Sequence, residues 1–409
     1  MAGGLHLPQV KRALVIGGSM SGLLAALALA RRGIEAEVFE RAAEPLTGRG
    51  AGIVAQPELK DVLRALGLAA DRDLGVEVPT RVMYAHDGCL THRVDIAQTM
   101  TAWDRVFHLL ISALGLDRYH PGKELRQVAQ GGRGVVAHFA DGSSAEGDVL
   151  VGADGIRSTV RQQFLPDVAP LYAGYAAWRG LIPEADFPAA LHAQLFMEFC
   201  FCLPPNEQML GYPVAGPNND LRTGHRRYNF VWYRPANEAT ELPRMLTDDS
   251  GRTHALSIPP PLIARAVITQ MRREAAQVLP PQFNEMLALC AQPFLQPIYD
   301  LVVPHMAFGR VAIVGDAAFV ARPHVGAGVA KAAEDALLLA DALARAEDVE
   351  AALKQFETAR LPAGERIIAR ARQLGAYVQA DLKTQAERVY AILHRKPEAV
   401  LSETAMMNF

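Results

Sequence analysis

Cysteine, tryptophan and surplus charge are all scarce in this 409-residue chain. The few cysteines have no metal-ligand spacing, so we predict no metal site and expect buried thiols in a reducing compartment. They are Cys89, Cys200, Cys202 and Cys290. A net charge of −3 argues against a nucleic-acid partner or an anionic membrane surface. The longest apolar run, about residues 22–30, cannot span a bilayer, and no signal peptide is recognised, so we expect a cytoplasmic protein.

The segment 13–40 has the pattern of a nucleotide-binding strand–turn–helix–strand unit. An apolar strand (13–16) leads into a glycine-rich turn, an Ala/Leu-rich helix (23–30) and a second strand that ends at Glu40. The turn residues are Gly17, Gly18, Ser19, Met20, Ser21 and Gly22. Such a turn lets the backbone approach a pyrophosphate at a helix N-terminus, and Glu40, 18 residues after Gly22, can bind a ribose diol.

This fingerprint departs from G-x-G-x-x-G, because Ser19 occupies the place of the second glycine. The alternative interpretation is an ordinary βαβ turn with a solvated acid at the end of the strand. The distances between the strand, the helix and the acid favour dinucleotide binding.

The pattern along the chain predicts an α/β fold, in which a discontinuous Rossmann-like domain carries an inserted β-sheet domain and C-terminal helices. Helices are expected over 57–67, 103–114, 331–344 and 349–375. We assign 1–75, 101–171 and 291–345 to the nucleotide-binding domain, and 76–100 with 172–290 to the substrate domain. Residues 346–409 form the predicted C-terminal helical region.

Two further motifs point to a flavin rather than to NAD alone. Asp154-Gly155 follows a buried strand and precedes a helix that Ser158 can cap. Gly315-Asp316 ends another strand, and the loop 323–329 runs into a helix. A strand-end acid can hold ribityl hydroxyls, and a glycine-rich helix N-terminus can lie against the pyrimidine edge of an isoalloxazine.

With these three motifs in this order, the chain resembles the class A FAD-dependent aromatic hydroxylases, which share the para-hydroxybenzoate hydroxylase-like fold. Further similar stretches are 50–59, 172–180 and Arg322-Pro323-His324. The resemblance implies non-covalent FAD, NADH or NADPH as transient co-substrate, and dioxygen, with a flavin hydroperoxide transferring oxygen to an electron-rich ring. No second dinucleotide fingerprint is needed in this family.

Residues at the family's motif positions are expected to contact FAD. They are Gly17, Gly18, Ser19, Met20, Ser21, Gly22, Glu40, Arg41, Arg49, Gly52, Leu125, Asp154, Asp316, Pro323, Gly326, Ala327, Gly328 and Val329. We expect the Asp316 carboxylate to be buried, with ribityl hydroxyls as its partners. Trp103 stands where the family commonly has an arginine that touches FAD.

The substrate is expected to meet His324 and Tyr212 as the catalytic or polar groups of the pocket. Trp178, Arg179, Trp232 and Tyr233 are further candidates on the strands of the second domain, although core packing is an equally ordinary role for strand aromatics. The flavin loop departs from the common family form in the manner of the hydroxypyridine-hydroxylating branch. Few fixed cations are expected, because Arg179 and Arg227 can both point away, so a hydroxypyridine is favoured over a hydroxybenzoate.

Two rival functions remain open at this point. One is another FAD reaction on the same scaffold, by a dehydrogenase or an epoxidase. The other is a non-catalytic flavoprotein that acts as a sensor. The sequence leaves the oligomeric state open, and a homodimer is one expectation.

Overall fold

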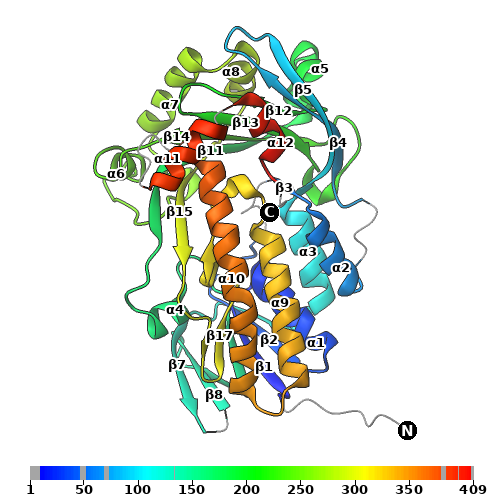
Figure 1. Ribbon diagram of the computed structural model, residues 1–409, viewed down its shortest axis with the longest axis vertical. Coiled ribbons are helices and arrows are strands. Elements are labelled where there is room, and N and C mark those ends of the chain that lie inside the picture. The colour runs from blue at the N-terminus through cyan, green and yellow to red at the C-terminus, as the bar shows by residue number, and fades with distance from the viewer. Residues whose placement is uncertain are drawn as a thin grey trace.

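The computed structural model describes residues 10–46, 52–68, 73–132, 134–378, 384–394 and 396–406. Two parts lie one above the other along the long axis of the molecule (Figure 1). The lower part holds a parallel sheet and long helices, and the upper part is built on a large sheet. The long helix α10 (Val349–Gly375) runs from the lower part towards the upper one (Figure 1).

The lower part is organised by a six-stranded sheet. In spatial order its strands are β16 (Ala307–Phe308), β17 (Val311–Ile313), β10 (Val149–Gly152), β1 (Arg12–Ile16), β2 (Glu35–Glu40) and β6 (Tyr119–Pro121). From β17 to β6 the neighbouring strands are parallel, with Val15 opposite both Val38 and Val151. Parallel strands bring their carboxyl ends to one edge, so the three motifs that follow β1, β10 and β17 meet there.

Helices and a small sheet surround this parallel sheet. The helices are α1 (Met20–Arg31), α2 (Pro57–Ala65), α3 (Trp103–Leu114), α4 (Thr159–Phe164) and α9 (Gly328–Arg345). Helix α9 packs against α1, α2 and α10. The small sheet contains β7 (Leu125–Gly131), β8 (Gly134–Phe139) and β9 (Ser144–Gly147), and it contacts β1 and β10. The four helices expected from the sequence are confirmed to within a few residues.

The upper part is built on a nine-stranded sheet. Its order is β18 (Phe319–Val320), β15 (Phe294–Val302), β11 (Leu171–Pro183), β14 (Arg227–Pro235), β13 (Gln208–Val214), β12 (Phe199–Cys202), β4 (Val76–Tyr84), β5 (Leu90–Ala102) and β3 (Gly52–Val54). The strands β3, β15 and β18 come from segments assigned to the first domain, so this sheet joins both predicted units. The domain boundaries stay a prediction.

Alternation along the strands gives this sheet two different buried faces. One face packs with helices α7 (Arg265–Val278) and α8 (Pro281–Ala288) in a core that includes Trp178 and Trp232. The other carries Tyr212 and Tyr233 towards the first domain. The remaining helices are α5 (Ala189–Leu195), α6 (Glu241–Met245), α11 (Gln385–His394) and α12 (Pro397–Glu403). Six short turns of 3-10 helix complete the described elements: Leu116–Arg118, Glu184–Asp186, Pro217–Asn219, Pro260–Leu262, Gly315–Ala317 and Pro323–Val325.

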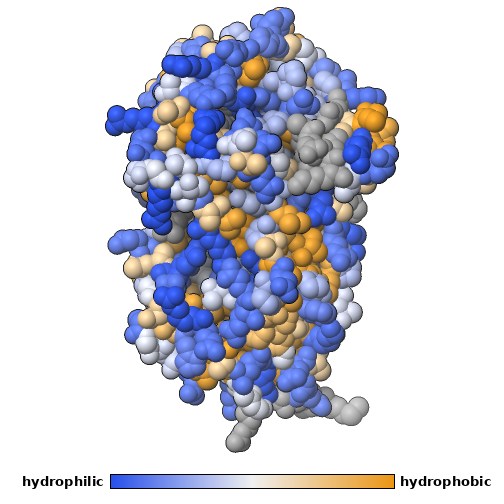
Figure 2. Space-filling view, turned by 90° about the vertical axis from the view of Figure 1, so that its left-hand side faces the viewer, coloured by the Kyte–Doolittle hydropathy of each residue, from blue (hydrophilic) through white to orange (hydrophobic). Residues whose placement is uncertain are grey.

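Hydrophilic residues cover most of the face seen in Figure 2, with smaller hydrophobic areas between them. No helix in the described ranges is long and apolar enough to cross a membrane. The four cysteines are free, and three of them are buried as expected. Cys89 is exposed, which corrects the expectation for that residue, because it lies in the turn between β4 and β5.

Candidate functional site

A groove opens along the carboxyl edge of the parallel sheet. Its cavity has a volume of about 460 Å³, and residues from all three sequence motifs line it. These are Gly17, Ser19, Glu40, Arg41, Asp154, Gly155 and Asp316, together with Trp103 and Leu125. Residues up to 299 positions apart in sequence therefore share one cavity, because their strands end at one edge.

The glycines of the first motif are required by close backbone contacts. Gly17 has a φ of 106°, and a Cβ there would overlap the carbonyl of Ala153 at the start of the second motif. A Cβ on Gly22 would overlap the carbonyl of Gly17, so a larger residue would push the turn apart. Ser19 caps α1 without a side-chain hydrogen bond, which leaves the first N–H groups of the helix available to an anion.

The Glu40 carboxylate is buried beside the same turn. Its Oε2 accepts a 2.7 Å hydrogen bond from the backbone N–H of Gly18, and its Oε1 accepts one of 2.9 Å from Ala42. Glu40 therefore helps to hold the turn as well as lining the groove. Each carboxylate oxygen accepts more than one hydrogen bond, so these contacts leave capacity for a ribose hydroxyl.

Asp154 holds the second motif through the first backbone N–H groups of the following helix. Its Oδ2 accepts from the backbone N–H groups of Thr159 (2.7 Å) and Val160 (3.2 Å), and Ser158 Oγ caps the same helix through Arg161 N. Burial raises the pKa of Asp154. Its Oδ1 is buried and has no partner among the described residues, so it is available to a bound group.

Asp316 differs from expectation, because its side chain is 53% exposed rather than buried. It follows β17 within a 3-10 turn and lies at the junction of two cavities, so it faces open space. Its Oδ1 lies 3.2 Å from the Nζ of Lys331, whose side chain is fully buried in α9. The neighbouring Gly315 N–H donates to Asp335, which also pairs with Arg360 of α10.

A second cavity of about 240 Å³ begins where the groove reaches Asp316. The loop before α9 forms one wall through Pro323, His324, Gly326, Ala327, Gly328 and Val329. The nine-stranded sheet forms another through Gly52, Arg179, Phe199, Leu210, Tyr212, Val231, Tyr233 and Gln296. The cavity therefore lies between the expected flavin loop and the sheet expected to hold the substrate.

Strand alternation decides which of the expected sheet residues reach this cavity. Tyr212, Tyr233 and Arg179 line it, whereas Trp178 and Trp232 lie in the core on the other face. The expectation that Arg179 points away is wrong. The expectation for Arg227 holds, since its Nε donates to the carbonyl of Ala215 and the residue is not in the cavity wall.

His324 is buried in the cavity wall and makes one side-chain hydrogen bond among the described residues. Its Nε2 lies 2.9 Å from the hydroxyl of Tyr175, and its ring lies 4.2 Å from that of Tyr233, centroid to centroid. Burial, with a smaller contribution from Arg322, lowers the pKa of His324 to about 3. The imidazole is therefore neutral at physiological pH and suits hydrogen bonding better than proton abstraction. Its Nδ1 is buried and has no partner within the described ranges.

The charges around the cavity are mostly compensated. Arg322 pairs with Asp300 at 2.8 Å and with Glu387 at 3.3 Å, and Lys331 compensates Asp316. Arg179 donates to the neutral Gln296 Oε1 at 2.8 Å and has no carboxylate partner in the described part of the chain. Burial raises the pKa of Tyr212 to about 12, so this phenol stays protonated. One positive charge therefore faces the cavity uncompensated.

The remaining expected cofactor residues take supporting places. Gly18, Met20, Ser21 and Gly22 are not in the wall of either cavity; a Cβ on Gly18 would overlap Tyr119, and Ser21 packs under Gly315. Arg49 lies outside the described residues.

Sequence reasoning missed Lys331, Tyr175 and Arg161. The buried Arg161 donates to the carbonyls of Ile156 and Ala317, and it thereby joins the second motif to the third. The signal available for Lys331 was a lysine on the apolar side of a helix.

The groove and the second cavity together fit an adenine dinucleotide with a flavin at its far end. The close-packed glycines, the uncapped start of α1 and the orphaned Asp154 Oδ1 are features that such a ligand would use. The described residues contain no group of three or more metal-ligating side chains.

Two protein-family matches agree with this geometry. Residues 15–64 match the NAD(P)-binding Rossmann-like domain family. Residues 172–300 match the FAD binding domain-like family. The first match contains the glycine turn and Glu40, and the second contains the strands that supply most of the sheet residues in the wall of the second cavity.

Proteins of named activity align along most of the chain. The 2,6-dihydroxypyridine 3-monooxygenase of Paenarthrobacter nicotinovorans is 32% identical over 375 residues, which cover 91% of this chain and 92% of that protein. The 3-amino-4-hydroxybenzoate 2-monooxygenase of Streptomyces cremeus is 31% identical over 387 residues, with coverages of 89% and 86%.

Solved structures show the same architecture. The 2,6-dihydroxypyridine-3-hydroxylase from Arthrobacter nicotinovorans matches with a TM-score of 0.85 at 31% identity, over 93% of this chain and 96% of that one. Klebsiella pneumoniae HpxO complexed with FAD and uric acid has a TM-score of 0.76 at 22% identity, over 98% and 99%, and shares the fold.

Proposed function

The chain belongs to the FAD-dependent aromatic monooxygenases, and from that premise we propose that it hydroxylates a small hydroxylated N-heteroaromatic, a hydroxypyridine ahead of a hydroxybenzoate. It is an aromatic-ring hydroxylase that uses FAD and NAD(P)H with dioxygen. Bound FAD supplies the electron transfer and oxygen activation. The protein binds and orients the substrate and keeps water out of the site.

The cofactor is proposed to lie along the groove and to reach the second cavity with its flavin. The turn 17–22 and the start of α1 would hold the pyrophosphate, Glu40 a ribose, and Asp316 the ribityl hydroxyls. The start of α9 at Gly328 would meet the pyrimidine edge, and this helix too begins without a side-chain cap. Lys331 would hold the exposed Asp316 carboxylate in place.

The single observation that carries the substrate proposal is His324, which lines the cavity and whose buried Nδ1 has no partner among the described residues. A neutral imidazole can pair with a ring nitrogen or a ring N–H, which a hydroxypyridine has and a benzoate ring lacks. A buried imidazole nitrogen without a partner costs about 1–3 kcal/mol, which a ring nitrogen or ring N–H placed against it would recover. Arg179 would offer its uncompensated charge to an ionised ring hydroxyl, and this ionisation would make the ring more electron-rich. A benzoate carboxylate would also pair with Arg179, so this cation does not by itself favour a pyridine.

The test is a panel of hydroxypyridines and hydroxybenzoates, with NAD(P)H oxidation and hydroxylated product measured together. We expect the highest coupled kcat/KM with a hydroxypyridine. His324→Phe keeps an aromatic ring next to Tyr233 but removes both nitrogens. It should lower kcat/KM for the pyridines about tenfold or more while leaving the benzoates nearly unchanged. A benzoate hydroxylated with higher specificity than every pyridine would refute the substrate class and leave the family assignment intact.

The cellular location and the oligomeric state are also proposals. Four free cysteines support a reducing, cytoplasmic location. A homodimer remains a prediction that light scattering on the purified holoprotein would check.

A further inference from the structure

The C-terminal turn of the described chain forms part of the second cavity. Thr404 and Ala405 line it, next to the flavin loop and the sheet. They follow α12, which packs against β4 and β5 of the nine-stranded sheet. Figure 1 shows α12 in the upper part of the molecule, close to these strands. A segment more than 300 residues from those strands therefore completes a site that the motifs do not mention.

Arg81 on β4 holds this turn. Its side chain is fully buried, and its Nη1 donates to the backbone carbonyls of Leu401 and Thr404, the latter at 2.8 Å. Its Nε and Nη2 donate to Gln98 Oε1, and no carboxylate pairs with it in the described ranges. Burial lowers the pKa of Arg81 only to about 10, so it stays charged. Carbonyls at the end of a helix are the partners that suit a buried cation without a carboxylate.

The same guanidinium supports a second part of the cavity wall. It lies over the ring of Phe199, with its central carbon 5.2 Å from the ring centroid, and Phe199 lines the cavity. Removing the cation would therefore loosen two adjacent surfaces that a substrate would touch.

Ala405 connects the turn to the flavin loop. Its N–H donates to the carbonyl of His324 at 2.7 Å, and its own carbonyl accepts from Gln56 Nε2 at 2.7 Å. Its φ of 54° is unusual for a residue with a side chain, so these contacts must hold it there. A Cβ on Gly326 would approach the Cβ of Ala405 to 3.1 Å, which shows how closely the turn packs on the loop.

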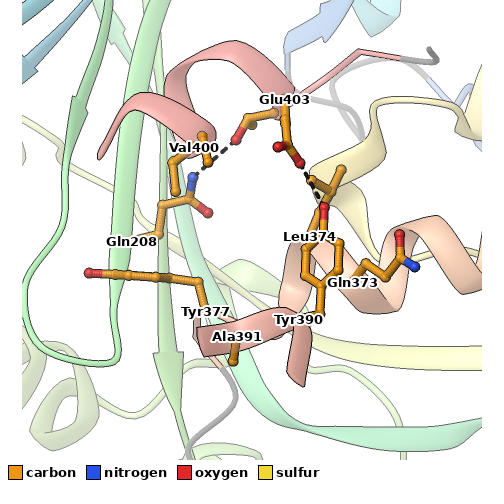
Figure 3. Close-up of a pocket in the computed structure, with 10 residues that line it drawn as sticks. Gln208, Gln373, Leu374, Tyr377, Tyr390, Ala391, Val400 and Glu403 are labelled. Atoms are coloured by element: carbon orange, nitrogen blue, oxygen red, sulfur yellow. Dashed lines mark hydrogen bonds between the residues drawn. The ribbon is translucent and has the colours of Figure 1, made fainter. Parts of the chain in front are cut away.

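The outer side of the turn is fixed as well. Figure 3 shows Glu403 directed to Tyr390 of α11, and the two are joined by a 2.7 Å hydrogen bond. Arg370 of α10 lies 3.0 Å from the same Glu403 carboxylate, and Gln208 Nε2 lies 3.5 Å from Thr404 Oγ1. The turn is thus held from β4, β13, α10 and α11 at once.

We propose that Arg81 is a positioning residue that fixes the turn 401–405 as a wall of the substrate cavity and, through Ala405, fixes the backbone of His324. The turn thereby confines the substrate next to the flavin. This inference rests on the proposed placement of substrate in the second cavity.

The first test needs no substrate. Hydrogen exchange of the FAD-loaded Arg81→Met variant should show the peptide containing Ala405 exchanging about tenfold faster than in the parent protein, with the loop 323–329 following it. Arg93→Met is the matched control, because Arg93 lies on neighbouring β5 but forms a half-exposed ion pair with Glu198 at 2.8 Å. Unchanged protection of Ala405 in Arg81→Met would show that Arg81 does not fix the turn 401–405, whatever the substrate is.

The second test uses the best substrate of the panel. Compared with Arg93→Met, Arg81→Met should raise KM about tenfold and divert NAD(P)H oxidation from hydroxylation to hydrogen peroxide. Unchanged KM and coupling would show that the turn 401–405 does not confine the substrate. If Arg81→Met fails to fold, Arg81→Lys provides the comparison, because a lysine keeps the charge but lacks the fork that reaches both Gln98 and the two carbonyls. If no panel compound is hydroxylated by the parent protein, the proposed substrate class fails. The exchange test still decides whether Arg81 fixes the turn 401–405.

Discussion

A substitution at Gly328 tests whether a glycine is needed there for folding or for cofactor binding. It is the first residue of α9 and lines the second cavity, and a Cβ added there would meet no protein atom within 4 Å. Gly22 is the opposite case, because its added Cβ would overlap the carbonyl of Gly17. The free space beside Gly328 is where the flavin is proposed to lie.

Gly328→Ala should therefore stabilise the apoprotein and weaken FAD binding. Replacing glycine by alanine in a helix raises the free energy of unfolding by about 0.5–1 kcal/mol. Forcing a methyl group into a packed contact costs on the order of 1–3 kcal/mol, which corresponds to roughly a tenfold to hundredfold higher Kd for FAD. Gly22→Ala should lower both the stability of the apoprotein and its affinity for FAD.

The measurements are denaturant unfolding of the apoprotein and fluorescence titration with FAD. Gly132→Ala is the matched control, since a Cβ at this exposed position also meets no atom within 4 Å but lies at the end of the β7–β8 hairpin. It should leave the Kd for FAD unchanged. An unaltered Kd in Gly328→Ala would show that the start of α9 does not contact the flavin, and the proposed cofactor placement would be abandoned.

Three further outcomes are expected. The protein should purify yellow with one FAD per chain that heat or acid releases in free form, and a colourless protein unable to take up FAD would contradict the placement of the cofactor. Asp316→Ala should raise the Kd for FAD more than Arg41→Ala does, because Asp316 is the proposed partner of the ribityl hydroxyls and Arg41 lies at the exposed adenosine end. Equal dissociation constants would contradict this ranking. His324, whose pKa falls to about 3 on folding, should contribute stability that is present above about pH 6.5 and is lost as the pH falls towards 3, by at most about 1.4 kcal/mol per pH unit. Denaturant unfolding between pH 7 and pH 4 should then show a steeper loss for the parent than for His324→Gln, and parallel curves would disprove the buried neutral state.

The sequence alone determined the elements whose form depends on short-range geometry. The unit β1–α1–β2 follows from glycines that only a tight turn needs, and the order of the three motifs predicted a flavoprotein of this family. The helix capped by Ser158 and Asp154 was equally readable, because a cap lies within a few residues of the N–H groups it satisfies. These features are encoded by spacing along the chain.

Tertiary structure decided what spacing could not. Alternation along a strand defines two faces, but Trp178 and Arg179 could each have faced the cavity, and only packing of α7 and α8 on one face settled the choice. Asp316 is exposed because its strand ends where two cavities meet, a property of the assembled sheet. The contact of Arg81 with the turn 401–405 joins residues 320 or more positions apart, so no local pattern could have predicted it.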